Sequence, residues 1–565
     1  MIQHSSPISG IDAHFPYVAT AGYDNRVILW DARTHEALAE SRHDHLANQC
    51  RFSSSGTMLA TSSSDYSARI WSIPDMRLRA ILADHEDDVE MTAISPDECR
   101  VATVSRDRAV RIYSIDGKLL HRMDGHESDV LSVEWAAQGS QLITSGDDAT
   151  VRRWDAETGT LTSTTRLGDV ETDTIAIVDD ELLFLGNDNG ELVAITQEAP
   201  PNFYAAHDAG IKRLAYDRDR LTLVSASYDR TVRFWQLMPG GIPTQNQYAR
   251  IPSEVWPRSF ARLDQFRWVF GTFGTTYAEL DAADSQWITS KVEPTPGLNA
   301  VRAVQSAIYS VGDSGEVSKD GRQVAALGSC CNFLTSFGGH VFTGGQLGIL
   351  FDARTGAVVY KHTSPLNCAT TIGDREDGRL IIGTYTGEGL VFREDGMSVT
   401  YERQVKLHDN AIKGLSSHGA TLFSVCATGA VGFHHFPDLQ ACRFIPNAHE
   451  RICNGAASLQ SGEFVSVSRD RTLRLWNTSG EQLAIVQTPH ENSIKCVAAD
   501  SATRLIATGG YRGRVAVYSL SGERWVYNRR VTHAGISGLS ETGEPGTFLA
   551  SSYDGTVYTI RAANV

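Results

Sequence analysis

The stretch from Gly125 to Asp155 reads GHESDVLSVEWAAQGSQLITSGDDATVRRWD and decides the fold. It holds three short apolar runs, Val130 to Trp135, Leu142 to Ser145 and Val151 to Trp154. Small and Asx residues separate the runs, and short runs bounded in this way are typical of β-strands joined by tight turns. The stretch therefore predicts three strands, with a fourth strand leading onward. No window of the chain shows sustained helical periodicity.

The same pattern recurs along the chain. The Trp near the end of the stretch has equivalents, at intervals of 41, 42, 41, 41 and 40 residues, at Trp30, Trp71, Tyr113, Trp154, Ile195 and Trp235. After a weaker middle the period returns at Phe392, Phe433, Trp476, Tyr518 and Ile560. A period of about 40–45 residues with a Trp-Asp ending is typical of a four-stranded propeller blade.

The number of repeats predicts two rings. Weaker equivalents near Leu280, near Ser318 and at Phe351 bring the number of repeats to fourteen. A single propeller holds about 4–8 blades, and one core stops growing at roughly 250–300 residues. We therefore expect an all-β protein with two seven-bladed β-propellers of four-stranded antiparallel blades.

Two divisions of the chain fit this number. In the favoured one, residues 1-240 form blades one to six of the first propeller, residues 533-565 complete it, and residues 250-530 form the second propeller. The reason is that the last repeat stops after its third strand, so that Met1 to Gln3 could pair with the open edge. The alternative is a division in chain order into 1-292 and 297-565.

Four residue types recur together in the strong repeats: a His before the first strand, a Ser or Thr in the second, an Asp in the turn and a Trp in the third. On these residues the chain resembles the WD-repeat β-propeller family, in which they form one buried hydrogen-bonded set. The matching tetrads are His43, Thr61, Asp65, Trp71; His126, Thr144, Asp148, Trp154; His207, Ser225, Asp229, Trp235; and His449, Ser466, Asp470, Trp476.

A Ser, a His and an Asp together also suggest a hydrolase. Here, however, the set recurs once per repeat, and no Gly-x-Ser-x-Gly nucleophile motif occurs in the sequence. The resemblance implies that these residues are framework, so we expect no catalytic residues and no enzyme activity.

Composition limits the cellular setting and the partners. A net charge of -16 disfavours nucleic acid as a partner. Nine cysteines without a Cys-x-x-Cys pair argue against a disulfide scaffold and a zinc site. The N-terminus has neither a basic start nor an apolar core, and no apolar stretch approaches the roughly 18 residues of a membrane span. We expect a cytoplasmic protein that needs no cofactor or metal and binds neither nucleic acid nor membranes.

The turns that carry the structural Asp open onto one face of a propeller, which in WD-repeat proteins commonly binds partners. The residues directly before this Asp, or before its equivalent, are Tyr23, Arg106, Asp147, Tyr228, Arg469, Tyr511 and Tyr553. Tyr and Arg are enriched at interface hot spots, so the tyrosines and arginines are partner-binding candidates. The alternative is that each tyrosine packs over the turn of its own blade.

Lysine gives a second signal, because the chain has only eight. Three of them, Lys212, Lys413 and Lys495, share the place His-x-x-x-Ile-Lys. At the start of an innermost strand, a cation could meet an acidic partner or ligand. The alternative is common descent of the repeats, with the lysine stem packed and its head paired with a nearby Asp.

An acidic run, Asp84, Glu86, Asp87, Asp88 and Glu90, lies in the corresponding loop of the third repeat. It lacks the alternating ligands and the glycine of a calcium loop. We therefore expect a solvated negative rim.

Together these features predict a non-catalytic scaffold or adaptor that binds other proteins through its propeller rims. The alternative is a propeller enzyme or a small-molecule sensor that uses a central channel. That alternative needs a convergent polar set in one channel that does not recur by repeat, and none is recognisable in the sequence.

Overall fold

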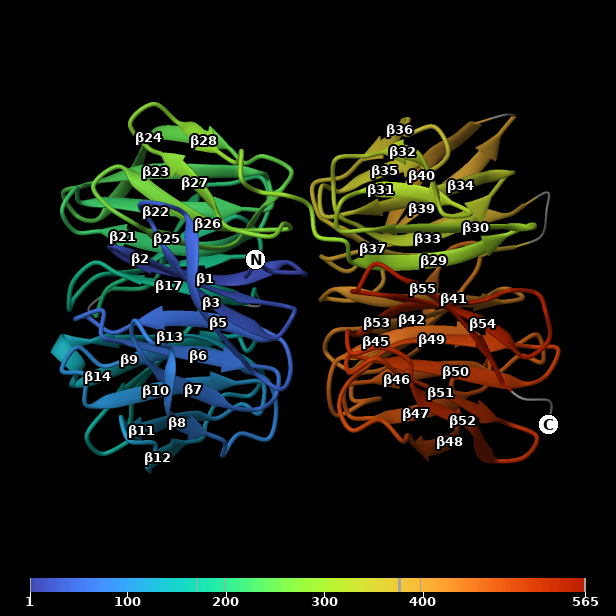
Figure 1. Cartoon of the computed structure of the whole chain (residues 1–565), viewed down its shortest axis with the longest axis horizontal. Coiled ribbons are helices and arrows are strands. Elements are labelled where there is room, and N and C mark those ends of the chain that lie inside the picture. Colours follow the sequence, from blue (N-terminus) through green and yellow to red (C-terminus); the bar gives the residue numbers. More distant parts are fainter. Residues whose placement is uncertain (1, 169, 198, 374–376, 397, 563–565) are drawn as a thin grey trace. The chain divides into compact units, whose positions relative to one another are not determined.

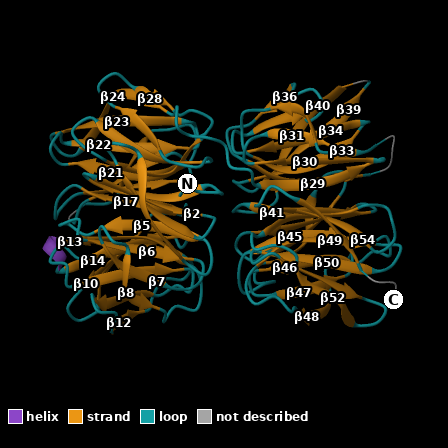
Figure 2. Cartoon of the chain, in the orientation of Figure 1, coloured by secondary structure: helices purple, strands orange, loops and turns teal. Residues whose placement is uncertain are grey.

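A computed structural model of the chain describes residues 2–168, 170–197, 199–373, 377–396 and 398–562. The fold is built of strands and loops (Figure 2), and within these ranges the one helical element is the 3₁₀ turn η1 (Ala137–Gly139). In the same ranges the strands form fourteen sheets, which we number as blades 1 to 14 in chain order. The predicted all-β class and the predicted number of blades are confirmed.

Blade 4 shows how the sequence builds one sheet. Its strands β13 (Val130–Ala136), β14 (Gln141–Gly146), β15 (Thr150–Asp155) and β16 (Leu161–Arg166) pair antiparallel in chain order. The apolar side chains of the first three strands are buried against blade 3 on one face and against blade 5 on the other, whereas most of the polar outer strand β16 is exposed. Each blade thus buries its faces against its neighbours in the ring, as stacked sheets do.

The chain divides into two compact units, Met1–Thr295 (unit 1) and Pro296–Val565 (unit 2) (Figure 1). In each unit the first strands of successive blades contact one another, and the last contacts the first, so they line the centre of a closed ring of seven blades. In unit 1 these inner strands are β1 (Ile8–His14), β5 (Ala47–Phe52), β9 (Val89–Ile94), β13, β17 (Thr172–Ile177), β21 (Ile211–Asp217) and β25 (Val255–Arg262). In unit 2 they are β29 (Leu298–Val304), β33 (Cys331–Phe337), β37 (Leu366–Ile372), β41 (Ile412–His418), β45 (Cys453–Ser458), β49 (Ile494–Asp500) and β53 (Ile536–Glu541).

Ring closure contradicts the favoured division of the chain. Blade 1 closes on blade 7, where the backbone N–H of Ile11 donates to Oγ of Ser259 at 2.9 Å. Blade 14 closes on blade 8, where the Ser537 hydroxyl donates to the carbonyl of Leu298. The inserted ring, 250-530 within 1-240 and 533-565, is therefore wrong. The observed boundary lies where the chain-order alternative, 1-292 and 297-565, puts it.

The N-terminal residues belong to unit 1 and do not complete blade 14. Ile2 packs against the apolar cluster shared by blades 1 and 7, and the N–H of His4 donates to the carbonyl of Thr275 at 2.9 Å. Met1 lies outside the described residues. Blade 14 has the strands β53, β54 (Thr547–Ser552) and β55 (Val557–Arg561), and no fourth strand pairs with β55 in the described part of the chain.

A β-bulge marks the start of the inner strands. In blade 6, Ile211 and Arg213 face consecutive residues of the next strand, so Lys212 is the bulged residue. Such a bulge re-aims one side chain. Five asparagines at this place donate Nδ2–H at 2.7–3.1 Å to the carbonyl of the first residue of the next inner strand. They are Asn48, Asn299, Asn332, Asn367 and Asn454.

A second bulge lies just before the Trp position, between the third and fourth strands. In blade 4 the register shifts between Arg153 and Trp154, and in blade 11 it shifts between Phe433 and His434. His434 Nε2 lies 2.8 Å from Oγ of Ser424, as the Trp Nε1 does in other blades. The Trp equivalent of blade 11 is therefore His434, and the expected Phe433 is wrong by one residue.

Candidate interaction surface

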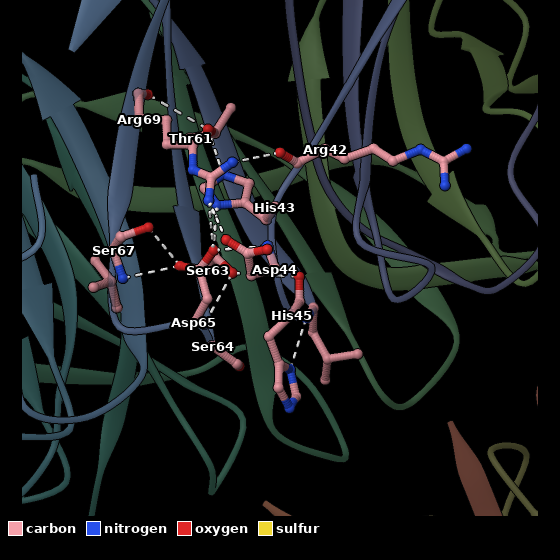
Figure 3. A network of polar contacts seen from close by, with 12 residues as sticks. Arg42, His43, Asp44, His45, Thr61, Ser63, Ser64, Asp65, Ser67 and Arg69 are labelled. Carbon is pink, nitrogen blue, oxygen red and sulfur yellow. Dashed lines mark hydrogen bonds and ion pairs between the residues drawn. The ribbon is translucent and has the colours of Figure 1, made fainter. Parts of the chain in front are cut away.

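The predicted tetrads are hydrogen-bonded frameworks inside the blades. In blade 2 the ring nitrogens of His43 lie 2.8 Å from Thr61 Oγ1 and 3.1 Å from Asp65 Oδ2 (Figure 3). Trp71 Nε1–H donates to Thr61 Oγ1 at 2.9 Å. The N–H of Asp44 donates to the same Asp65 oxygen. The other three predicted sets are bonded in the same way, through His126, Thr144, Asp148, Trp154; His207, Ser225, Asp229, Trp235; and His449, Ser466, Asp470, Trp476.

Burial and hydrogen bonding fix the charges in these frameworks. Burial lowers the pKa of His43, against the effect of its bond to Asp65. Burial opposes ionisation of Asp65, but the bonds from His43 and neighbouring groups hold the pKa of this carboxyl below its usual value. The same balance brings the pKa of Asp229 to about 2. Each set, with its ionised Asp, therefore joins the strands of its blade through fixed hydrogen bonds.

Blade 1 carries a complete tetrad that the sequence pattern did not predict. His4 lies 2.8 Å from Oγ1 of Thr20 and 3.0 Å from Asp24, and Trp30 donates to Thr20 at 2.8 Å. The spacing from His to Thr is two residues shorter than in blades 2, 4 and 6, so the set escaped a search at fixed intervals. The Trp at the end of the repeat was the signal that could have found it.

Two of the tyrosine candidates contact other blades or neighbouring charges. Tyr23 lies edge-on to Trp256 of blade 7 at 5.5 Å, and its hydroxyl accepts from Arg258 at 3.4 Å. Tyr228 lies beside the ammonium of Lys212, 5.4 Å from the ring centre. These tyrosines thus do more than cover the turns of their own blades.

The unit 2 candidates form a separate set. The Arg469 guanidinium lies 6.0 Å from the ring centre of Tyr511, on the adjoining blade. Tyr553 is half-buried in the turn of blade 14. Because the two units divide after Thr295, Tyr553 does not share a ring with Tyr23 and Tyr228.

The three lysines do occupy equivalent places, because each is the bulged second residue of its inner strand. Lys212 is buried, and its ammonium pairs with Asp173 at 2.6 Å and with Asp188. Its head is thus held by carboxylates of blade 5. Lys413 and Lys495 are half-buried at the place where four other blades of unit 2 have an asparagine and blade 14 has a serine.

Six carboxylates gather at the end of unit 1 where the inner strands begin, and we call them the acidic mouth. They are Glu90 of blade 3, Asp129 and Asp147 of blade 4, and Glu171, Asp173 and Asp188 of blade 5. Three cations lie among them: Arg106 pairs with Glu90 and Asp129, Lys212 with blade 5, and Arg258 with Glu90 at 3.5 Å.

Two carboxylates of the acidic mouth have raised pKa values. Burial and the nearby Asp129 raise the pKa of Asp147 to about 8. Burial and the neighbouring Asp147 raise the pKa of Glu171 well above its usual value. Repulsion between close carboxylates and loss of hydration both favour protonation, so an added cation would be stabilised here.

The acidic run that begins this region is only partly solvated, contrary to expectation. Asp84 and Glu86 are exposed, but Asp87, Asp88 and Glu90 are 8%, 1% and 8% exposed. Asp88 accepts a bond from the Ser64 hydroxyl at 2.9 Å, which brings this loop against blade 2. The solvated-rim prediction is wrong for Asp87, Asp88 and Glu90, because their side chains are buried.

A convergent charged set lies at the centre of unit 1. Arg51 of blade 2 pairs with Glu134 of blade 4, across the ring. Arg213 of blade 6 is only 6% exposed, and burial, with the repulsion of Arg51, lowers its pKa to about 10. Glu134 and Asp12 of blade 1 attract it. Two arginines and two carboxylates from four different blades make up the set, so it does not recur by repeat.

Within the described residues, no group of three or more His, Cys, Asp or Glu side chains is arranged to hold a metal ion. In the same part of the chain, no helix has the length and apolar character needed to cross a membrane.

Known proteins match the blades with complete frameworks. The WD40 family model, described as "WD domain, G-beta repeat", matches residues 1–31, 40–72, 76–114, 117–155, 199–236 and 440–477. Each segment stops at or near the end of the third strand of a blade. The blades are 1, 2, 3, 4, 6 and 12, in which the His and Asp are hydrogen-bonded. Six of the fourteen blades thus carry WD repeats.

Individual relatives are similar over part of their length. "Echinoderm microtubule-associated protein-like 2" of Rattus norvegicus is 29% identical over 147 residues, 25% of this chain and 22% of that protein. "WD repeat-containing protein 1" of Gallus gallus is 31% identical over 116 residues, 20% of this chain and 19% of its own length. "Nuclear distribution protein PAC1" of Komagataella phaffii is 26% identical over 180 residues, 28% of this chain and 36% of that protein. The chain thus covers well under two thirds of each of these relatives.

Proposed function

We propose that the protein is a non-catalytic scaffold whose acidic mouth in unit 1 binds lysine or arginine side chains of a partner protein. The observation that carries the proposal is the gathering of six carboxylates from three blades, with the pKa of Asp147 raised to about 8. A partner cation would relieve the repulsion that raises this pKa. Charge complementarity of this kind sets specificity and association rate.

Aromatic side chains around the mouth support the same partner chemistry. Tyr23 and Tyr228 present ring faces and hydroxyls near Arg258 and Lys212. Aromatic faces attract cations, which would add to the attraction of the carboxylates. In unit 2, Arg469, Tyr511, Tyr553, Lys413 and Lys495 would form a second surface, suited to a different partner.

The charge of the chain favours protein partners over nucleic acid or membrane surfaces, because a net charge of -16 repels phosphate. We also propose a cytoplasmic location, since all nine cysteines are free thiols, as is typical of a reducing compartment. Two of the relatives are named for microtubules or for nuclear distribution, and they match 25% and 28% of this chain.

A titration with a lysine-rich peptide, followed by fluorescence anisotropy, tests the proposal. We expect the variant Asp147→Asn with Glu171→Gln to bind the peptide at least tenfold more weakly than the wild type. Glu157→Gln is the matched control, because its carboxylate lies on blade 4, in the turn at the other end of β15 from Asp147, and is 90% exposed. Equal affinity of the double variant and the control would contradict the proposal.

The charged set at the centre of unit 1 favours a second candidate, a small-molecule sensor. Arg213 is buried beside Arg51, and its Nε atom has no hydrogen-bond partner among the described residues. A small carboxylic acid or amino acid could pair with it. A screen of such ligands by thermal unfolding, repeated with Arg213→Gln, separates the candidates: a ligand stabilising only the wild type would favour the sensor.

A further inference from the structure

Blade 13 lacks the Asp carboxylate that is hydrogen-bonded to the framework His in six other blades. Its His490 lies 2.9 Å from Oγ1 of Thr508, as in the other tetrads. The turn, however, reads Tyr511-Arg512, where blade 6 has Tyr228-Asp229 and blade 14 has Tyr553-Asp554. An arginine therefore stands in place of the structural aspartate.

The other frameworks show what this aspartate does. In six blades one of its oxygens is bonded to Nδ1 of the His, and a carboxylate oxygen accepts the backbone N–H of the residue after the His (Figure 3). The pairs are His4 and Asp24, His43 and Asp65, His85 and Asp107, His126 and Asp148, His207 and Asp229, and His449 and Asp470.

In blade 13 neither donor finds such an acceptor. His490 is only 5% exposed, and among the described residues its Nδ1 and the N–H of Glu491 have no carboxylate partner. Burial, with the positive charge of Arg514, lowers the pKa of His490 to about 4. The imidazole is therefore neutral, and one side of it faces an open space.

That space is a pocket of about 60 Å³ lined by His490, Glu491, Asn492, Arg512, Arg514 and Arg530. Its small volume suits a small ion, since pockets for drug-sized ligands measure about 300–1,000 Å³. We call it the arginine pocket.

Glu491 is the carboxylate in the lining of the arginine pocket. It lies 3.5 Å from Arg512 and 3.2 Å from Arg514, but its side chain is 62% exposed and so pairs weakly. Arg514 also donates to Oδ1 of Asn528 at 2.6 Å, and Arg530 donates to the carbonyl of Thr532 at 3.2 Å. The lining thus combines three guanidinium groups with one carboxylate.

We propose that the arginine pocket binds a phosphate-type oxyanion, whose oxygens take the place of the missing aspartate carboxylate. One oxygen would accept from Nδ1–H of His490 and from the N–H of Glu491. The others would accept from Arg512, Arg514 and Arg530. Guanidinium forks match the geometry of phosphate, and three of them around one site favour a dianion over a single carboxylate.

Titration calorimetry on the full chain tests the site, with inorganic phosphate, sulfate and acetate as probes and chloride at equal ionic strength as the control. We expect phosphate to bind at least tenfold more tightly than acetate. Methyl phosphate distinguishes free phosphate from a phosphate ester as the ligand. Acetate binding as tightly as phosphate, or no phosphate binding, would overturn the proposal.

The variant Arg512→Asp is the decisive one, because it restores the carboxylate of the other blades. We expect it to fold, to lose phosphate binding by at least tenfold and to raise the pKa of His490 without any anion. Arg530→Gln, which lies outside the framework, should weaken phosphate binding while leaving thermal unfolding in chloride unchanged. Phosphate affinity unchanged in Arg530→Gln, or unchanged in a folded Arg512→Asp, would overturn the proposal.

Histidine NMR gives an independent readout. With ¹³C-labelled histidine, the His490 signal, assigned by its loss in His490→Gln, should titrate at a higher pH when phosphate is bound. A phosphate affinity without any change at His490 would place the anion elsewhere and contradict the assigned site.

Discussion

The ammonium of Lys212 in blade 6 lies 2.6 Å from Asp173 in blade 5, and this ion pair joins two blades at the acidic mouth of unit 1. The Lys212 side chain is 4% exposed, and its second partner, Asp188, is 15% exposed. The pair therefore holds a lysine that sequence reasoning assigned to partner binding.

Replacing this lysine should destabilise unit 1. Lys212→Met leaves Asp173 and Asp188 without their cation, and breaking a buried pair costs about 3–5 kcal/mol. Denaturant unfolding, with hydrogen exchange to resolve the two units, measures the loss. The exposed Lys118→Met is the control and should change nothing. A loss below about 1 kcal/mol would mean that the two carboxylates are held by other groups.

Removing the hydroxyl from a tetrad should weaken its blade. Thr61→Val leaves Trp71 Nε1–H and His43 Nε2 without their shared partner. Each buried polar group left unpaired costs about 1–3 kcal/mol. Thermal and denaturant unfolding should show this loss for Thr61→Val and almost none for the exposed Thr57→Val. Equal stability of the two variants would show that the tetrads are not framework.

Neutralising Asp147 should stabilise unit 1 at neutral pH. Its pKa of about 8 in the folded protein lies above the ordinary value of 3.8. Its contribution to the stability of unit 1 is therefore present at low pH and is lost as pH rises from about 4 through 8. Asp147→Asn removes this loss, and the gain over wild type should grow with pH across that window. Unfolding measured at pH 5, 6, 7 and 8 checks it, and a pH-independent difference would contradict the burial of this charge.

Unit 2 should lose stability in acid through three buried histidines. Burial lowers the pKa of His408 to about 3, of His434 to about 4 and of His490 to about 4. The unfolded chain takes up protons below pH 6.5 while the folded chain does not, so stability falls as pH drops from 6.5 toward 4. One unit of pKa shift corresponds to about 1.4 kcal/mol. Protection factors in blades 11 and 13, which correct each exchange rate for its intrinsic pH dependence, should fall between pH 7 and 4.5, and unchanged protection factors would contradict this reading.

The sequence was informative wherever one repeat holds its own determinants. Trp71 and Asp65 lie within one repeat at fixed spacing, so their blade, strand order and framework bonds were predictable. The division of the chain was not, because closure depends on a contact between Ile11 and Ser259, which lie in blades 1 and 7. The Trp equivalent of blade 11 was predicted one residue too early, at Phe433 instead of His434, because the sequence of this repeat does not indicate where its bulge lies.

The acidic mouth and the charged set at the centre of unit 1 could not be predicted from the sequence for a related reason. Arg51 and Glu134, or Arg106 and Asp129, come from different blades, and only the ring brings them together. The bulge likewise sets where Lys212 points, and a bulge follows from strand register rather than from residue type. Repetition therefore revealed the scaffold, whereas the exceptions to repetition make up the candidate sites.

A hydrogen-exchange footprint of the protein with a bound lysine-rich peptide tests the central claim most directly. We predict slowed exchange in the loops that carry the acidic mouth, at residues 84–90, 127–130, 147–150 and 188–191, and unchanged exchange in outer strands such as β16. Protection confined to unit 2 or to the outer strands, with the mouth loops unchanged, would contradict the account.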